Sequence, residues 1–166
     1  AGQLLDHAMV SFRLDNLSED ELEVQFLIKD AIDRISPLYD LKGIQIKNNS
    51  IQNCKVMGDP ILLQNALHNV LDNALKYCSE NDTVTVKVKD VSQNCIIEIM
   101  DSGEGFPQNS VLLTNRFTRG ENTKGIVGSG LGLTIAKDVV EAHGGNITIS
   151  NTEKGGACVT FTLPCS

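Results

Sequence analysis

Apolar residues recur at helical intervals in three parts of the chain. The first part spans residues 26–39 and is followed by Gly43, which can adopt the left-handed backbone that ends a helix. The second begins at Asp59 and Pro60, a capping acid and a proline suited to the first helical position, and runs to about Tyr77. The third spans residues 131–142. The pattern predicts that these residues face the core: Phe26, Ile28, Ile32, Ile35, Tyr39, Leu131, Ile135, Val139 and Ala142.

Alternating apolar and polar positions predict strands between and after these helices. Val84, Val86 and Val88 alternate with polar residues, and CIIEIM follows as a hairpin partner. Shorter strands are predicted at GIQIKN, CKVMGD, NITIS and CVTFTL, the last two joined by a glycine turn at residues 155–156. The acidic stretch at residues 14–25 is expected to hold at most one edge strand. Three helices and five or six mostly antiparallel strands predict an α+β fold, a mixed sheet with helices layered on one face.

The net charge, the length of the apolar stretches and the cysteine spacing limit the kinds of partner and site that are expected. The 166 residues carry a net charge of -7, which offers no general attraction to nucleic acid or anionic lipid. No apolar stretch approaches the roughly 20 residues that a spanning helix needs. The five cysteines are scattered without a C-x-x-C pair, so reduced structural thiols in a cytoplasmic setting are expected, not a zinc site or a disulfide framework. We therefore predict a cytoplasmic domain that contacts neither nucleic acid nor membrane.

The C-terminal third contains most of the glycine. Of 14 glycines, 11 lie between residues 101 and 156, and this is where a ligand is expected, since glycine permits close backbone approach. At the other end, residues 3–12 place apolar side chains at helical spacing with no cap before them. We expect residues 1–14 to be the tail of a longer helix and residues 15–166 to form the domain.

An amide stripe lies on the second helix. Asn65, Asn69, Asn73 and Lys76 are four, four and three residues apart and so share one face. Asparagine is a poor helix former, so a polar partner is expected. Amide oxygens suit magnesium, and lysine can neutralise phosphate. The alternative is an ordinary solvated helix face.

An acid closes an apolar strand at IIEIMDSGEGFP. A carboxylate at Asp101 needs a donor, and an adenine amino group would supply one. Gly103 and Gly105 would let the backbone turn and the base approach. An ordinary turn with a capping aspartate is the alternative interpretation.

A third motif is glycine-rich and leads into the last helix. Gly128, Gly130 and Gly132 precede successive backbone N–H groups that could hold a phosphate. The motif follows a loop and lacks G-K-[ST], which argues against a dinucleotide fingerprint and a Walker loop. Residues 120–128 are expected to form a lid, with Arg119 at its edge and Lys124 within it. A flexible surface loop is the alternative.

Together, NVLDNALKY, DSGEGFP, NRFTRG and GSGLGLTIAKDVVEAHGG resemble the asparagine, first glycine, phenylalanine and second glycine boxes of the catalytic and ATP-binding domain of sensor histidine kinases. The resemblance covers about residues 24–164 and implies the Bergerat fold of the GHKL superfamily, with ATP and Mg²⁺ as cofactors. It implies that Asn73 holds magnesium, that Asp101 takes the adenine amino group, and that Asn69, Lys76 and Arg119 serve the transfer. The remaining nucleotide contacts that it implies are Tyr77, Gly103, Gly105, Lys124, Gly128, Gly130, Leu131 and Gly132.

Two departures from the family pattern bear on activity. Thr114 stands where the phenylalanine box usually has a first aromatic residue, which concerns the anchoring of the lid. None of His7, His68 and His143 is followed by the acidic-x-x-Thr/Asn-Pro pattern of a phosphoacceptor histidine. The chain is therefore not expected to phosphorylate itself.

The expected activity is transfer of the ATP γ-phosphoryl group to a histidine on a separate dimerisation domain, with a response regulator as indirect partner. The parent kinase is expected to be a homodimer that a membrane anchor can hold, and this chain a monomer. Alternatives are a nucleotide-binding module without transfer, a GHKL ATPase and an anti-sigma-factor-type serine kinase. The ATPases and serine kinases usually carry glutamate where this chain has Asn69, which cannot act as a base. Slow hydrolysis is predicted.

Overall fold

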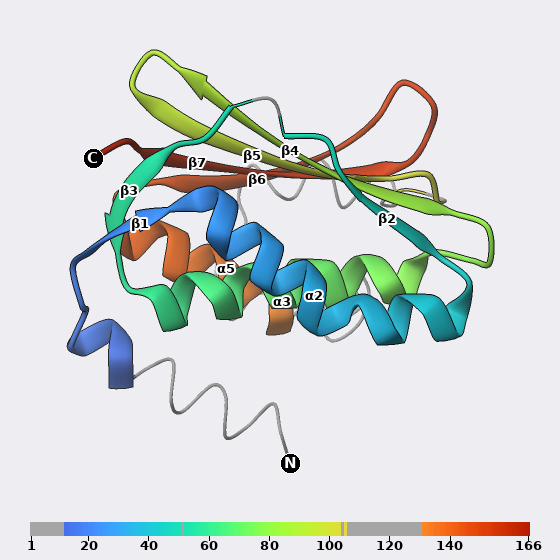
Figure 1. The fold of residues 1–166 in the computed structure, drawn as a ribbon, viewed down its shortest axis with the longest axis horizontal. Coiled ribbons are helices and arrows are strands. Elements are labelled where there is room, and N and C mark those ends of the chain that lie inside the picture. Colours follow the sequence, from blue (N-terminus) through green and yellow to red (C-terminus); the bar gives the residue numbers. More distant parts are fainter. Residues whose placement is uncertain (1–11, 51, 104, 106–130) are drawn as a thin grey trace.

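The computed structural model describes residues 12–50, 52–103, 105 and 131–166. In chain order the elements are β1 (Asp20–Glu23), α2 (Val24–Lys42), β2 (Gln45–Asn48), β3 (Lys55–Gly58), α3 (Pro60–Tyr77), β4 (Thr83–Val91), β5 (Asn94–Asp101), α5 (Leu131–Ala142), β6 (Asn146–Asn151) and β7 (Ala157–Pro164). Figure 1 shows two layers, a sheet with α2, α3 and α5 beneath it. The predicted α+β architecture is confirmed.

The main sheet has five strands in the order β2-β4-β5-β7-β6. β2 pairs with β4 in parallel, and the remaining pairings of this sheet are antiparallel. β1 and β3 form a separate antiparallel ribbon, in which Asp20 is opposite Gly58. The described residues therefore contain seven strands, not five or six, because the acidic segment pairs with β3 outside the main sheet.

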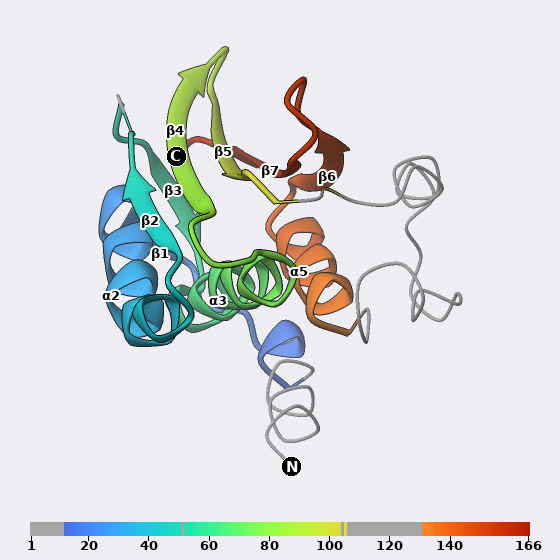
Figure 2. The same cartoon turned by 90° about the vertical axis from the view of Figure 1, so that its right-hand side faces the viewer.

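The helices pack side by side on one face of the sheet, with α3 between α2 and α5 (Figure 2). The core between the layers includes Val84, Val86 and Val88 of β4, each at most 1% exposed, as the alternation predicted. Leu62 and Leu71 of α3 meet it from the helical side and are 0% and 2% exposed. Burial of this apolar surface is the main force that holds the two layers together.

Two predicted core positions are wrong. Phe26 is 68% exposed, because α2 begins at Val24 and its buried face passes through Val24, Leu27 and Ile28. Phe26 is two residues from Val24 and from Ile28, about 200° around the helix from each. Ala142 is exposed for the same reason, since it lies two residues beyond the buried Val140.

The predicted helix boundaries hold where local capping decides them. Asp59 accepts hydrogen bonds from the N–H groups of Ile61 and Leu62, and Pro60 occupies the first turn of α3. Gly43 ends α2 with φ 77°, and Gly144 follows α5 with φ 80°. All five cysteines are free thiols, as predicted. Within the described part of the chain, no helix is both long and apolar enough to cross a bilayer.

Candidate nucleotide site

The amide stripe lies along α3 and is half-buried at Asn65, Asn69 and Asn73. Asn69 donates from Nδ2 to Oδ1 of Asn65 at 3.0 Å, and no hydrogen bond from the described residues reaches the Asn69 amide oxygen. No hydrogen bond from another described residue reaches the Asn73 side chain. An amide oxygen of this kind is a hard, neutral ligand that suits magnesium. The residues present therefore fit a magnesium ion at Asn73.

The C-terminal turn of α3 carries the two other predicted side chains of this helix. Lys76 pairs with Asp72 at 3.4 Å, but its side chain is half exposed, and such i,i+4 pairs contribute only about 0.3–0.5 kcal/mol. The ammonium can therefore leave Asp72 for a phosphate at little cost. Tyr77 is 43% exposed at the end of the helix.

Asp101 ends β5 with its carboxylate half-buried. Oδ1 accepts hydrogen bonds from the N–H of Gly103 at 2.9 Å and from the N–H of Ala157 at 3.1 Å. No hydrogen bond from the described residues reaches Oδ2, so this oxygen is available for an outside donor. Burial, which the two backbone hydrogen bonds only partly offset, raises the pKa of Asp101 above its ordinary value, and the nearby Asp82 raises it further.

The backbone after Asp101 passes closely against two other segments. A Cβ at Gly103 would lie 3.1 Å from the carbonyl oxygen of Tyr77, so this loop touches the end of α3. Gly105 has φ 82°, and a Cβ there would collide with the carbonyl oxygen of Gly155. The structure thus brings the C-terminal end of α3, the end of β5 and the turn before β7 together. The end of the helix that carries the amide stripe therefore adjoins the acid-glycine motif at this corner.

The remaining predicted residues belong to the predicted lid and to the second glycine motif. Arg119, Lys124, Gly128 and Gly130 lie outside the described residues, as does Thr114 of the phenylalanine box. The backbone of residues 131–132 forms the start of α5, and the Leu131 side chain lies outside the described part of the chain. Convergence of the lid with the other two motifs stays a prediction.

Three contacts of this corner were missed by the sequence analysis. Ala157 donates to Asp101 across 56 residues, and Asp82 accepts from the N–H of Ser79 at 2.7 Å and from the Ser102 hydroxyl at 3.3 Å. Asp82 orders the turn after α3 and thereby the backbone beside Gly103. Only the pairing of β5 with β7 could have indicated the first contact, and that pairing has no local signal.

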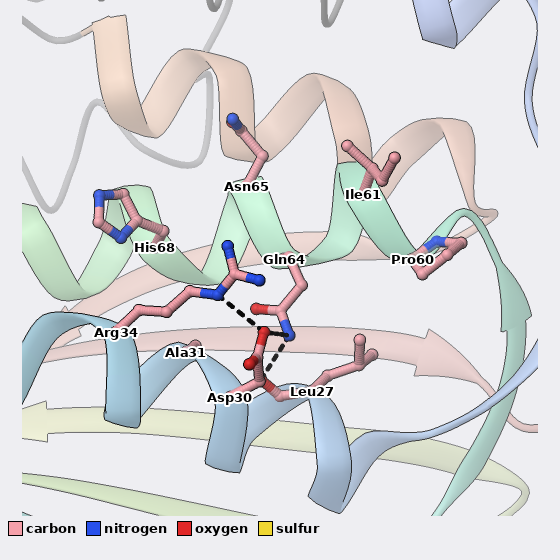
Figure 3. A pocket seen from close by; sticks show the side chains of 9 residues that line it. All are labelled: Leu27, Asp30, Ala31, Arg34, Pro60, Ile61, Gln64, Asn65 and His68. Carbon is pink, nitrogen blue, oxygen red and sulfur yellow. Dashed lines mark hydrogen bonds and ion pairs between the residues drawn. The ribbon is translucent and has the colours of Figure 1, made fainter.

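A separate pocket of about 560 Å³ lies between α2 and α3 (Figure 3). Gln64 donates to Asp30 at 2.9 Å, and the same carboxylate pairs with Arg34 at 3.0 Å, so these polar side chains already satisfy one another. Asn65 is the single predicted site residue among the lining side chains. This pocket is therefore distinct from the corner at Asp101.

The two described histidines are poor candidates for a phosphoryl acceptor. His143 accepts from the N–H of Asp59 through Nε2 at 3.0 Å, and its Nδ1 lies 2.7 Å from the carbonyl oxygen of Val139. With Nδ1 as donor, both ring nitrogens are engaged in structural hydrogen bonds. His68 is exposed on α3 and lines the α2–α3 pocket.

With this geometry established, comparison with known proteins identifies the family. Residues 58–166 match the family described as histidine kinase-, DNA gyrase B-, and HSP90-like ATPase. The matched segment contains α3, Asp101 and both glycine motifs. The chain belongs to this family.

Within this family, the chain is similar to sensor histidine kinases. The chain is 31% identical over 155 residues to the sensor-like histidine kinase SenX3 of Mycobacterium tuberculosis, covering 92% of this chain and 37% of that protein. It is 37% identical over 124 residues to the sensor histidine kinase WalK of Bacillus subtilis, covering 72% of this chain and 20% of the relative. The structure of the mycobacterial sensor histidine kinase MprB matches with a TM-score of 0.73 and 27% identity, covering 89% of this chain and 97% of that one.

These matches confirm the predicted family and fold. The chain is an ATP-binding catalytic domain of the histidine kinase type, and this domain is the catalytic part of protein-histidine kinases. It spans well under half the length of the curated relatives SenX3 and WalK.

Proposed function

We propose that this chain binds magnesium-ATP at the corner formed by α3 and β5 and transfers the γ-phosphoryl group to a histidine on a dimerisation domain. The observation that carries this proposal is that the two carboxylate oxygens of Asp101 differ in their hydrogen bonds. Oδ1 is held by two backbone N–H groups, which fixes the orientation of the side chain, while Oδ2 has no partner among the described residues. An acceptor held in this way suits the amino group of adenine.

The phosphates would then extend along α3. In this arrangement Asn73 holds magnesium through its amide oxygen, Asn69 lies beside it, and Lys76 exchanges Asp72 for a phosphate oxygen. Bound magnesium would neutralise charge on the transferring group. Arg119 and Lys124 would contact the phosphates from the lid, and Gly128, Gly130 and Gly132 would offer backbone N–H groups. Tyr77, Gly103, Gly105 and Leu131 would shape the base slot and the lid.

The chain's own residues would mainly position ATP, because phosphoryl transfer needs in-line placement and charge neutralisation more than covalent help. We propose that the attacking imidazole belongs to a dimerisation domain whose last helix includes residues 1–14. The domain proper would then be residues 15–166. A response regulator would receive the phosphoryl group afterwards, and the whole would operate in the cytoplasm as part of a dimeric kinase.

The presence of Asn69 argues against rapid ATP hydrolysis by this chain. Its amide donates to Asn65 at 3.0 Å and carries no charge, so it cannot remove a proton from water. We expect very slow phosphate release from the chain alone. We expect transfer of label from ATP when a histidine-bearing dimerisation domain is added. Rapid magnesium-dependent hydrolysis without that partner would favour an ATPase instead.

The first test replaces Asp101 by asparagine. Asp101→Asn can keep an acceptor oxygen for the N–H groups of Gly103 and Ala157, but it presents an N–H₂ group to the adenine amino group. Loss of a charge-assisted hydrogen bond costs about 1–3 kcal/mol, so ATP affinity should fall roughly ten- to hundredfold in a fluorescent-nucleotide titration. Asp33→Asn, an exposed change of equal charge on α2, is the control. Equal affinity in both variants would contradict the assignment.

The second test separates magnesium from the base. Asn73→Ala should remove the enhancement of ATP binding by magnesium and abolish transfer, while adenosine binding stays close to that of the parent chain. Asn49→Ala removes an exposed asparagine after β2 and should change neither. If Asn73→Ala retains both magnesium-dependent binding and transfer, then another side chain holds the metal.

A further inference from the structure

Three side chains from distant parts of the chain meet at the end of the sheet where β7 stops. The ligand atoms of Cys54, Asp90 and Cys165 all lie within 4.8 Å of one another. Cys54 directly precedes β3, Asp90 lies near the end of β4, and Cys165 follows β7. The sequence analysis predicted no zinc site here, because the spacing of these residues carries no motif. We propose that Cys54, Asp90 and Cys165 form a binding site for a thiophilic divalent cation of the Zn²⁺ class.

Backbone hydrogen bonds hold the three segments in place without any ion. The N–H of Cys165 donates to the carbonyl oxygen of Gln93 at 2.9 Å, and the N–H of Ser166 donates to that of Lys55 at 2.7 Å. The carbonyl oxygen of Cys54 accepts from Val24 at 2.9 Å. Asp90 is fixed in the β4–β5 ladder opposite Cys95. The backbone of all three ligands is therefore anchored by the fold, and the Cys54 side chain is buried, that of Cys165 is half-buried and that of Asp90 is exposed.

The distances suit a tetrahedral ion after a small adjustment. Sγ of Cys165 lies 3.8 Å from Oδ1 of Asp90, and the largest separation in the cluster is within 4.8 Å. Zinc binds sulfur at about 2.3 Å and carboxylate oxygen at about 2.0–2.2 Å, so tetrahedral ligands lie roughly 3.5–3.8 Å apart. Closure of the widest pair by about 1 Å, through side-chain rotation, would complete three protein ligands and leave the fourth position to water.

Both thiols must lose a proton to bind the ion. Burial, followed by Asp90 and Cys54, raises the pKa of Cys165 to about 11, so this thiol is protonated at neutral pH without metal. Binding converts two thiols, one carboxylate and Zn²⁺ into a dithiolate-carboxylate complex and releases two protons, with no change of oxidation state. Cys95 packs behind this set, fully buried, and burial and the adjacent Cys54 thiol raise its pKa, so it keeps its proton.

Such an ion would tie the C-terminal end of the chain to β3 and to the β4–β5 hairpin. The three ligands are separated by 36 and 75 residues, so the cross-link would close two long loops. A ligand that binds only the folded chain also raises its stability by mass action. The site is separate from Asp101, and its presence does not depend on the proposed kinase activity.

Cobalt(II) is a suitable probe, because it reports tetrahedral thiolate coordination by absorption. The chain is kept reduced with a phosphine and titrated with Co²⁺ without oxygen. We expect one equivalent to produce thiolate-to-cobalt charge-transfer bands and tetrahedral ligand-field bands, which Zn²⁺ then removes. Cys165→Ser should lower the affinity at least tenfold, and Asp90→Asn should also weaken it. Cys158→Ser, a buried thiol elsewhere on β7, should bind like the parent chain, and circular dichroism verifies that each variant is folded.

Three results would overturn the proposal. One is the absence of thiolate-cobalt absorption in the reduced parent chain. Another is equal cobalt affinity in the parent chain, Cys165→Ser and Asp90→Asn, which would show adventitious binding elsewhere. The last is a disulfide between Cys54 and Cys165 in the oxidised chain together with no metal binding in the reduced chain, which would make the cluster a redox pair. Loss of the bands only in variants of the three ligands would support it.

Discussion

Removal of the Asp59 carboxylate should strongly lower the free energy of unfolding of the domain. Asp59 is fully buried, and its oxygens accept five hydrogen bonds. Two come from the Arg13 guanidinium at 2.9 Å, one from the N–H of Ser18, and two from the N–H groups of Ile61 and Leu62. One side chain thus caps α3 and ties the preceding segment to it.

The magnitude follows from these partners. Loss of an N-cap costs about 0.5–2 kcal/mol, and hydrogen bonds to a charged group are worth about 1.5–3 kcal/mol. The Arg13 side chain is 28% exposed and can recover part of its hydration, and its Nε is buried without a partner in the described structure, which already lowers the value of the pair. We therefore expect Asp59→Ala to lower the free energy of unfolding by about 2–4 kcal/mol. Asp59→Asn keeps a capping oxygen and should cost about half as much.

Urea unfolding monitored by circular dichroism measures this loss. With a slope of about 2 kcal/mol/M, the midpoint for Asp59→Ala should fall by roughly 1–2 M while the slope stays constant. Asp33→Ala, on the exposed face of α2, should change the free energy of unfolding by less than about 0.5 kcal/mol. In a double-mutant cycle, Arg13→Met and Asp59→Asn should show a coupling of at least about 1 kcal/mol. A coupling near zero would refute the argument that the guanidinium stabilises the buried carboxylate.

The Asp59 carboxylate should also affect how the free energy of unfolding decreases at acidic pH. Burial alone would raise the pKa of Asp59, but hydrogen bonds from Arg13, Leu62 and Ser18 lower it below the ordinary 3.8. The ionised form therefore stabilises the fold above that ordinary value, and the contribution is lost as the pH falls through the lower folded value. The Asp59→Asn chain should lose less stability over this window than the parent chain. If the parent chain and Asp59→Asn lose stability identically as the pH falls, the pKa of Asp59 is not lowered.

Two further outcomes follow from buried groups near the site. The Tyr39 hydroxyl donates to the carbonyl oxygen of Leu71 at 2.7 Å in the core. Tyr39→Phe should therefore lower the free energy of unfolding, measured in urea, by about 0.5–1.5 kcal/mol. If the variant is as stable as the parent chain, this hydrogen bond makes no net contribution to stability. Because the pKa of Asp101 is raised, adenine binding should weaken with falling pH earlier than an ordinary aspartate would allow, since only the ionised carboxylate accepts at both oxygens. Asp101→Asn should show no such pH dependence, and a matching decline in both proteins would assign the titration to another group.

Local chemistry in the sequence determined several helix ends and the inward face of β4. Asp59 and Pro60 start α3, Gly43 ends α2, and the valines of β4 alternate as their burial does. Each of these signals acts over a few residues, through a cap, a left-handed turn or a period of two, and needs no partner from elsewhere. The acid and the amide stripe of the proposed nucleotide site could be found in the sequence for the same reason, because their residue types and spacing are themselves unusual.

Tertiary structure decided what depends on register and on contacts between distant segments. The face of α2 that is buried excludes Phe26, and β1 found its partner in β3 outside the main sheet. The pairing of β5 with β7 brought the N–H of Ala157 to Asp101, so that one carboxylate oxygen is held and the other has no hydrogen bond from the described residues. The thiols of Cys54 and Cys165 meet only because the chain returns past β3 at its end. Such contacts are set by how whole strands and helices pack, and a linear pattern of residues carries no record of which distant segments will become neighbours.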